Sequence, residues 1–230
     1  MHGDGSANIQ KDFDKLSSAG VIKMRYYIAD CHFGHDKARI LDNRNFDSVG
    51  QMNEEMIAIW NRTVRKKKDE VVILGDLSVE KGEAVNTLLK RLNGRKYLVS
   101  GNHDMRFLHD KKFDASLFEW IKPYAELRDN NRTVVLSHYP VICYNGQYHG
   151  NSTYMLYGHV HNTADYQNVK RFVTETRESF SGEESIPCNM INCFAVFSGY
   201  RPMALDEWIG MEKCYETQLS RRHGLSRYKN

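Results

Sequence analysis

The chain has 230 residues, of which 41% are hydrophobic and 27% are charged. This length fits one domain, or one domain with a small appendage, and a chain of this size buries roughly 70–75% of its unfolded surface without disulfides or a structural metal. The composition excludes a disordered chain, and no apolar run approaches the roughly 18 residues of a membrane span, which excludes an integral membrane protein. With 32 basic and 29 acidic residues, the charge balance does not by itself indicate a nucleic-acid partner.

The cysteines and the first residues indicate a cytoplasmic protein. The five cysteines are an odd number, and without a Cys-x-x-Cys pair they favour reduced thiols. The polar residues 1–23 include Asp4, Asp12 and Asp14 but no apolar stretch, so we expect no secretory signal. Because the first strand-like run starts at Met24, we expect residues 1–23 to form an extension outside the fold.

From residue 24 onward, strand-like and helical segments alternate along the chain. Residues 49–64 carry an apolar stripe at helical spacing after Ser48, and Gln51 stands in the capping-box position. A second helical face covers 84–92, and Gly94 stands where a helix is expected to stop. The strand-like apolar runs are 24–29, 70–75, 96–100, 133–137, 154–157 and 190–197.

The last third of the chain contains a long polar stretch and a helix. We expect residues 163–189 to be irregular, and helical spacing from Trp208 predicts an amphipathic helix that ends near Gly224. Alternating strands and helices indicate the α/β fold class. We expect one domain over 24–212, followed by the helix end and a basic tail over 213–230.

Polar side chains follow five of the predicted strands, at the points where the strands end. In open α/β sheets, ligands bind outside the carboxyl ends of the strands, so we expect these side chains to lie close together. The segments are Asp30-Cys31-His32, Gly75-Asp76, Gly101-Asn102-His103-Asp104, His138 and Gly158-His159-Val160-His161.

These segments offer oxygen and nitrogen donors, which suits a metal site. In Asp30-x-His32 and His159-x-His161, alternate residues can face the same side of an extended segment. Seven ligands are too many for one tetrahedral ion and suit two ions that share a carboxylate, an arrangement that clamps the oxygens of a phosphoryl displacement. The seven candidates are Asp30, His32, Asp76, Asn102, His138, His159 and His161.

The ordered set of five motifs resembles the calcineurin-like metallophosphoesterase superfamily. The stretch DCHFGH at 30–35 is similar to that of small bacterial and phage-type members. The motifs span residues 30–161, and their order carries the resemblance, because each dipeptide alone is a weak signal. The resemblance implies an α/β fold in which two packed β-sheets are flanked by α-helices.

The resemblance also implies a role for each matching residue. His103 would lie near the phosphate or the leaving group, oriented by Asp104. The implied reaction is hydrolysis of phosphate monoesters or diesters by in-line attack of a hydroxide that bridges two metals. The implied ligands are Asp30, His32 and His161 for one metal and Asn102, His138 and His159 for the other, with Asp76 shared by both.

The donor types leave several metals open. Nitrogen and oxygen ligands are compatible with Mn, Fe, Co, Ni or Zn, and we expect two divalent ions, with Mn²⁺ the first choice for activity. We expect the substrate to be a small-molecule or nucleotide phosphoester. His35, Arg44 and His149 are candidate substrate-side residues, and a structural role in a loop is the alternative for each.

Two other classes of function remain as alternatives. One is a nucleic-acid-processing nuclease in which the basic run 65–68 and the basic tail position a strand over the metals. We favour a solvated helix end for 65–68, because cations suit the carboxyl end of a helix. The other class is a non-catalytic metal-binding interaction protein, which the complete ligand set argues against.

Overall fold

The computed structural model describes residues 23–148, 152–179 and 186–226. Its strands form two four-stranded sheets. The first has the order β1-β2-β3-β4 and is parallel, whereas in the second, of order β5-β6-β7-β8, only the β5–β6 pair is antiparallel. The strands are β1 (Arg25–Ile28), β2 (Glu70–Leu74), β3 (Arg95–Val99), β4 (Trp120–Lys122), β5 (Tyr124–Asp129), β6 (Arg132–Ser137), β7 (Thr153–Tyr157) and β8 (Met190–Asn192).

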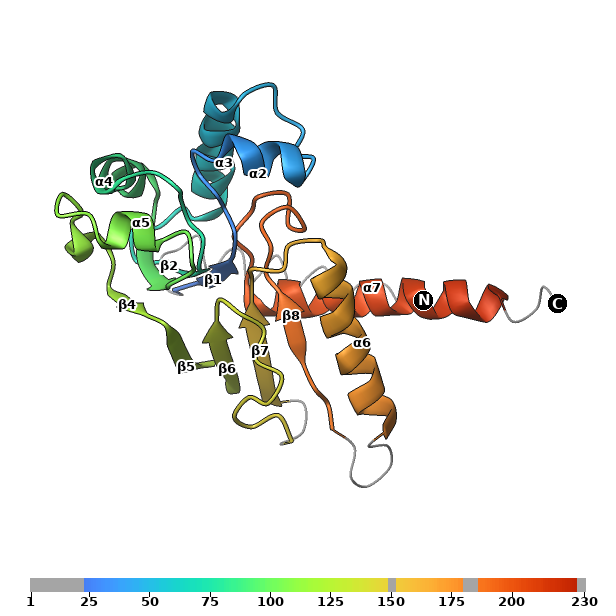
Figure 1. Cartoon of the computed structure of the whole chain (residues 1–230). Coiled ribbons are helices and arrows are strands. Elements are labelled where there is room, and N and C mark those ends of the chain that lie inside the picture. Colours follow the sequence, from blue (N-terminus) through green and yellow to red (C-terminus); the bar gives the residue numbers. More distant parts are fainter. Residues whose placement is uncertain (1–22, 149–151, 180–185, 227–230) are drawn as a thin grey trace, which may run out of the picture.

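Helices cover the outer face of each sheet, so the layers run helix, sheet, sheet, helix (Figure 1). α3 packs on the first sheet through Trp60 and α4 through Leu89, whereas Val169 and Val173 of α6 pack on the second sheet. This arrangement confirms the expected α/β fold with two packed sheets. The helices are α2 (Asp36–Leu41), α3 (Val49–Thr63), α4 (Gly82–Arg91), α5 (Met105–Leu108), α6 (Ala164–Ser179) and α7 (Leu205–Ser226), with a 3₁₀ turn η1 at Ala115–Leu117.

The space between the sheets is filled by apolar side chains from both. Tyr27 and Val72 of the first sheet belong to one buried cluster with Leu136 and Leu156 of the second. Trp208 of α7 joins this cluster, and its Nε1 donates a hydrogen bond to the carbonyl of Tyr27 at 3.0 Å. Burying each of these large side chains stabilises the fold by about 1.5–3 kcal/mol, so the two sheets form one rigid support for the loops at their ends.

The start of α3 follows from its sequence. The Ser48 side chain accepts a hydrogen bond from the backbone amide of Gln51, and the Gln51 side chain accepts one from the amide of Asp47. The first bond satisfies an amide group that a helix leaves unpaired at its first turn, and the second holds the residue before the cap against the helix. Met52 and Met56 lie on the buried face, so the predicted helix is confirmed.

The prediction for residues 163–189 is wrong in its first part, because Ala164–Ser179 forms α6. Tyr166, Val169 and Val173 are buried at spacings of three and four residues, which gives the helix one narrow apolar stripe. The other positions are mostly polar and face solvent, so the polar composition hides the helical pattern.

Two further differences concern strands. The expected strand over 190–197 ends at Asn192, whose side chain accepts a hydrogen bond from the amide of Phe194 as the chain turns. The strands Trp120–Lys122 and Tyr124–Asp129 escape sequence reasoning because the first is only three residues long and the second is half polar. They carry the chain from one sheet to the other.

The described part of the chain begins at Lys23, whose ammonium group pairs with Glu70 at 2.6 Å. The rest of the extension expected before Met24, residues 1–22, lies outside the described residues. α7 reaches Ser226, close to the predicted helix end at Gly224. Within the described ranges, no helix combines the length and the apolar character needed to cross a bilayer.

Candidate metal centre

The seven predicted ligands lie together at the carboxyl ends of the strands. Beyond the ends of β1 and β2, the following loops stay paired, because the amide of Asp30 donates to the carbonyl of Gly75 and that of His32 to the carbonyl of Asp76. Donor atoms of Asp30, His32 and His161 form one group within 4.8 Å of one another, and those of Asp76, His138 and His159 form a second. Asn102 lies against the second group.

The first group brings three side chains from distant segments to one point. Nε2 of His161 lies 3.6 Å from Oδ1 of Asp30 and 3.1 Å from Nε2 of His32. Two imidazole nitrogens and a carboxylate oxygen that face one another at these distances form an N/O donor set for a divalent cation.

The second group shares a carboxylate with the first. Oδ2 of Asp76 lies 3.5 Å from Nε2 of His138 and 3.7 Å from Nε2 of His32, so it stands between the two sets. Oδ1 of Asn102 lies 3.2 Å from Nε2 of His138 and 3.1 Å from Nδ1 of His159. The arrangement suits two ions with Asp76 as the shared ligand.

The backbone at the site is strained. Five of the seven candidates adopt a left-handed φ, which costs a residue with a side chain of order 1–3 kcal/mol. Such conformations persist where the surrounding structure fixes them, and here the strand ends and paired loops do so. The five are Asp30 (55°), His32 (54°), Asp76 (52°), His159 (69°) and His161 (45°).

Two glycines leave space for the donors. At Gly75, whose φ is +84°, a Cβ atom would come within 2.3 Å of Nδ1 of His138. At Gly101, a Cβ atom would come within 2.3 Å of Oδ1 of Asp76. Because real Cβ contacts are not this short, any larger residue at either position would displace a candidate ligand.

The electrostatics keep His32 neutral and Asp76 charged, which are the forms that bind a metal, whereas they favour the protonated form of His161, whose Nε2 proton an ion would have to displace. Burial lowers the pKa of His32 to about 2, so its ring is a neutral donor. Burial alone would raise the pKa of Asp76, but His138 and His32 outweigh it and bring that pKa to about 2. Burial would lower the pKa of His161, but hydrogen bonds to the carboxylates of Asp30 and Asp42 raise that pKa to about 9. Buried carboxylates among imidazoles are groups that a cation stabilises.

Comparison with known families agrees with this geometry. Residues 26–200 match the family model described as calcineurin-like phosphoesterase. The chain belongs to this family. The resemblance in the ordered motifs is thereby confirmed, and the family is one of metal-dependent phosphoesterases.

Two other proteins are similar to this chain over most of its length. An uncharacterized protein of Methanocaldococcus jannaschii is 31% identical over 183 residues, which cover 79% of this chain and 86% of that protein. The crystal structure of a protein of unknown function from Aquifex aeolicus has a TM-score of 0.51 at 22% identity and covers 81% of this chain and 97% of that one. The second likeness shows the fold.

His103 lies beside the first donor group. Its ring is partly exposed and packs at 5.1 Å from the ring of His32 and 5.3 Å from that of His35. His103 also belongs to a third donor group with His32 and Asp76. It is therefore within reach of a group bound at the centre, and its predicted role near the phosphate stays a prediction.

Asp104 is fully buried and holds the loops of the centre together. Its carboxylate accepts hydrogen bonds from the amides of Asp76, Leu77 and Gly101, at 2.8–2.9 Å. Burial raises the pKa of this carboxyl to about 7, although the amides of Gly101 and Leu77 favour the charged form. That Asp104 orients His103 stays a prediction. Its three hydrogen bonds to backbone amides connect the loops after β2 and β3.

The three candidate substrate-side residues fall in different places. His35 is partly exposed, and its Nδ1 lies 3.1 Å from Nδ1 of His32. Arg44 has no exposed side-chain surface, so its position favours a structural role. His149 lies outside the described residues. Sequence reasoning missed Asp42, whose Oδ1 lies 2.7 Å from Nδ1 of His161, because no motif signals it.

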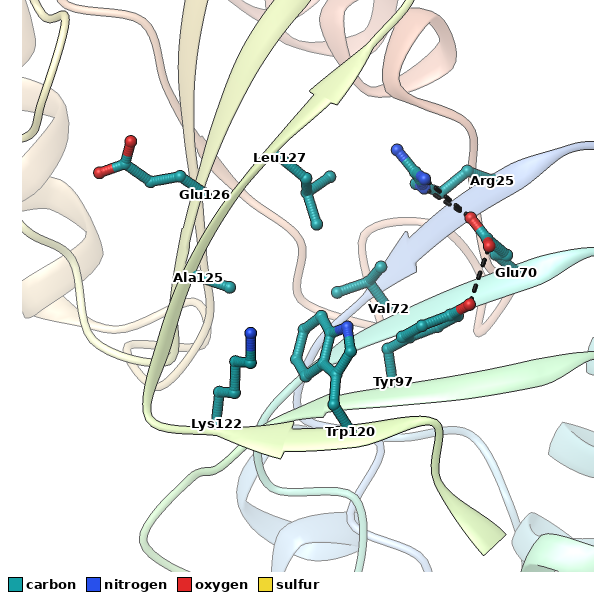
Figure 2. Close-up of a pocket in the computed structure, with 9 residues that line it drawn as sticks. All are labelled: Arg25, Glu70, Val72, Tyr97, Trp120, Lys122, Ala125, Glu126 and Leu127. Atoms are coloured by element: carbon teal, nitrogen blue, oxygen red, sulfur yellow. Dashed lines mark hydrogen bonds and ion pairs between the residues drawn. The ribbon is translucent and has the colours of Figure 1, made fainter. Parts of the chain in front are cut away.

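A pocket of about 260 Å³ opens between the sheets, and none of the candidate ligands lines it. Figure 2 shows the residues that do line it. Arg25 and Glu70, the first residues of β1 and β2, line one side of it, whereas the ligands follow the last residues of these strands. Trp120 and Lys122 of β4 line another side, with the Lys122 ammonium 5.4 Å from the centre of the indole ring. The pocket is therefore separate from the candidate metal centre.

Proposed function

We propose that this chain is a dinuclear metal-dependent phosphoesterase that hydrolyses phosphate monoesters or diesters. The observation that carries the proposal is the placement of Asp76 Oδ2 between the two sets of donors, at 3.5 Å from His138 and 3.7 Å from His32. The ions that the residues fit would acidify water near neutral pH and neutralise charge on phosphoryl oxygens.

The chain's own residues supply the rest of the chemistry. Asp30, His32 and His161 would hold one ion, and Asp76 would be shared with a second ion held from the side of Asn102. The partly exposed His103 ring would stabilise charge on the phosphoryl oxygens and, when protonated, donate to the leaving oxygen. Mn²⁺ is the first choice for activity.

We propose a small-molecule or nucleotide phosphoester as the substrate. The candidate centre includes exposed side chains of Asn102 and His159, so a phosphate can approach it from solvent. We also propose a cytoplasmic protein, because no disulfide joins the cysteines in the part of the chain that the structure describes.

The test is hydrolysis of bis-p-nitrophenyl phosphate by metal-stripped protein, with and without added Mn²⁺. We expect turnover that requires the metal and is lost in Asp76→Asn, because an amide neither bridges two cations nor carries the charge that holds them. Gly50→Ala, on an open helical site with only Ser48 nearby, serves as a matched control. Metal-independent turnover, or the absence of turnover with Mn, Fe, Co, Ni and Zn alike, would contradict the proposal.

A further inference from the structure

Asp42 and Arg44 follow α2 and lie beside the candidate metal centre, although neither belongs to a metal-binding motif. Asp42 directly follows the last residue of α2, and its side chain is 9% exposed. The Arg44 side chain has no exposed surface. Burying an arginine costs free energy unless its N–H groups are hydrogen-bonded. The hydrogen-bond partners of Arg44 and Asp42 therefore show what holds this pair in place.

The Asp42 carboxylate contacts the ring nitrogen of His161 that faces away from the other ligands. Nδ1 of His161 lies 2.7 Å from Oδ1 of Asp42, whereas Nε2 faces Asp30 and His32. An aspartate carboxylate accepts hydrogen bonds, so Nδ1 carries the proton that it donates to Asp42. In the neutral ring, Nδ1 therefore keeps the proton and the lone pair of Nε2 points toward the centre. A histidine that binds a metal through Nε2 needs this tautomer.

Arg44 connects Asp42 to the loop that carries two other candidate ligands. Its Nε and Nη2 donate to Oδ2 of Asp42 at 3.0 and 2.8 Å. Its Nη1 donates to the carbonyl of Cys31 at 2.7 Å, and Nη2 donates to the carbonyl of Asp30 at 3.0 Å. The guanidinium therefore fixes the carboxylate of Asp42 relative to the backbone of the Asp30–His32 loop.

Aromatic rings complete the support of this group. The His161 ring stacks on Phe194 with centroids 4.6 Å apart and an angle of 21° between the planes. The Arg44 guanidinium lies 5.8 Å from the ring centres of Phe194 and of Tyr200. Phe194 thus contacts both the histidine and the arginine, so the stacking and the hydrogen bonds together leave the imidazole one orientation.

We propose that Asp42 and Arg44 are positioning residues that set the affinity of the ion held by Asp30, His32 and His161. Asp42 fixes the tautomer and direction of His161, and Arg44 holds Asp42 and the Asp30–His32 loop in register. The inference rests on the proposed function, since it concerns an ion of the same centre. It gives the buried pair a role that differs from substrate binding, because a fully buried guanidinium has no surface to offer a phosphate.

The test compares metal binding by wild type, Asp42→Asn, Asp42→Ala and Arg44→Lys. Metal-free protein is titrated with Mn²⁺ by isothermal titration calorimetry, and metal content is measured after dialysis. We expect the Kd of one of two ions to rise about 10–100-fold in Asp42→Asn, as for other residues that support a metal-binding histidine, while the other ion binds as in wild type. Asp36→Asn is the matched control, because Asp36 begins the helix that Asp42 follows, is exposed and pairs with Arg39.

A second set of variants tests whether Asp42 acts through His161. His161→Ala should weaken the same ion, and adding Asp42→Asn to it should cause no further loss, since residues that act as a unit are not additive. Circular dichroism and thermal unfolding of the metal-free variants check the fold, and Asp42→Asn serves if Asp42→Ala does not fold.

Three results would overturn the inference. They are wild-type binding of both ions in Asp42→Asn, an equal loss of both ions, and an additive loss in the double variant. Wild-type protein that binds no divalent ion would instead overturn the proposed function together with the inference, so the two failures are distinguishable.

Discussion

The carboxylate of Asp104 accepts a hydrogen bond from the backbone amide of Asp76, the shared candidate ligand, at 2.9 Å. It also accepts hydrogen bonds from the amides of Leu77 and Gly101, so one buried side chain fixes the loops after two neighbouring strands. The position of Asp76 between the two donor groups therefore depends on a residue that has no place in either group.

We predict that Asp104→Asn destabilises the metal-free protein by about 1–3 kcal/mol. The amide of asparagine has one acceptor oxygen, so at least one buried backbone amide loses its partner, at about 1–3 kcal/mol for each. Urea unfolding followed by circular dichroism measures the change. His103→Ala is the matched control and should change stability far less, because His103 is partly exposed. Equal stability of Asp104→Asn and wild type would show that the three bonds do not hold the loops.

The proposed role of His103 as a general acid predicts that the effect of its removal depends on the leaving group. If the protonated ring donates to the leaving oxygen, His103→Ala should slow hydrolysis of alkyl phosphoesters far more than that of p-nitrophenyl esters, whose leaving group needs no proton. General acid catalysis contributes about 10²–10⁴-fold, so the expected difference between the two substrate types is of that order. The measurement is kcat/KM for matched alkyl and nitrophenyl esters.

Wild-type protein and Asp36→Asn, which alters an exposed carboxylate, provide the reference ratio between the two substrates. An equal loss for both substrates in His103→Ala would favour a purely electrostatic role for the ring.

The sequence predicts the candidate metal ligands better than it predicts the residues that hold them in position. Asp30 and His32 are predictable because they follow an apolar strand and stand in a motif whose order is specific. The contact between Asp42 and His161 joins residues 119 positions apart and follows from how α2 ends, so no local pattern announces it. The anchoring role of Asp104 is hidden for the same reason, because its partners are backbone amides that every residue type offers.

The fold shows a similar division. β2 is predictable because all five of its residues are buried and its run is continuously apolar after Glu70. α6 is missed because its buried face has only three residues, Tyr166, Val169 and Val173, and the packing against β7 that selects them is a tertiary effect. Short or half-polar segments such as β4 and β5 acquire their structure from neighbouring strands, which one sequence window does not contain.

Removal of residues 1–22 is predicted to leave thermal stability and phosphoesterase activity unchanged. The family match begins at residue 26, and the fold's first strand begins at Arg25. The truncation keeps Lys23, whose ammonium group pairs with Glu70. Differential scanning calorimetry and bis-p-nitrophenyl phosphate turnover measure the effect, and a large loss of either would contradict an extension outside the fold. A longer truncation that also removes Lys23 is the matched comparison and should lower stability slightly.

Glu70 lines the pocket between the sheets (Figure 2). We predict that its carboxylate contributes to the stability of the fold in a pH-dependent way. Burial would raise the pKa of this carboxyl, but hydrogen bonds from Lys23, Tyr97 and Arg25 outweigh burial and hold the pKa below its usual value. Because the folded-state pKa is depressed, the stabilisation is present above the unfolded-state pKa of about 4.3 and is lost as the pH falls through the folded-state value.

We therefore expect Glu70→Gln to destabilise the protein by about 1–3 kcal/mol at pH 7, because hydrogen bonds to a charged group are lost. The difference in unfolding free energy between the variant and wild type should shrink as the pH falls below about 4. Urea unfolding at a series of pH values measures it. Glu119→Gln is the matched control, because Glu119 forms an exposed pair with Arg95 and such pairs contribute little. A difference that stays constant down to acid pH would mean that Glu70 acts through packing rather than through its charge.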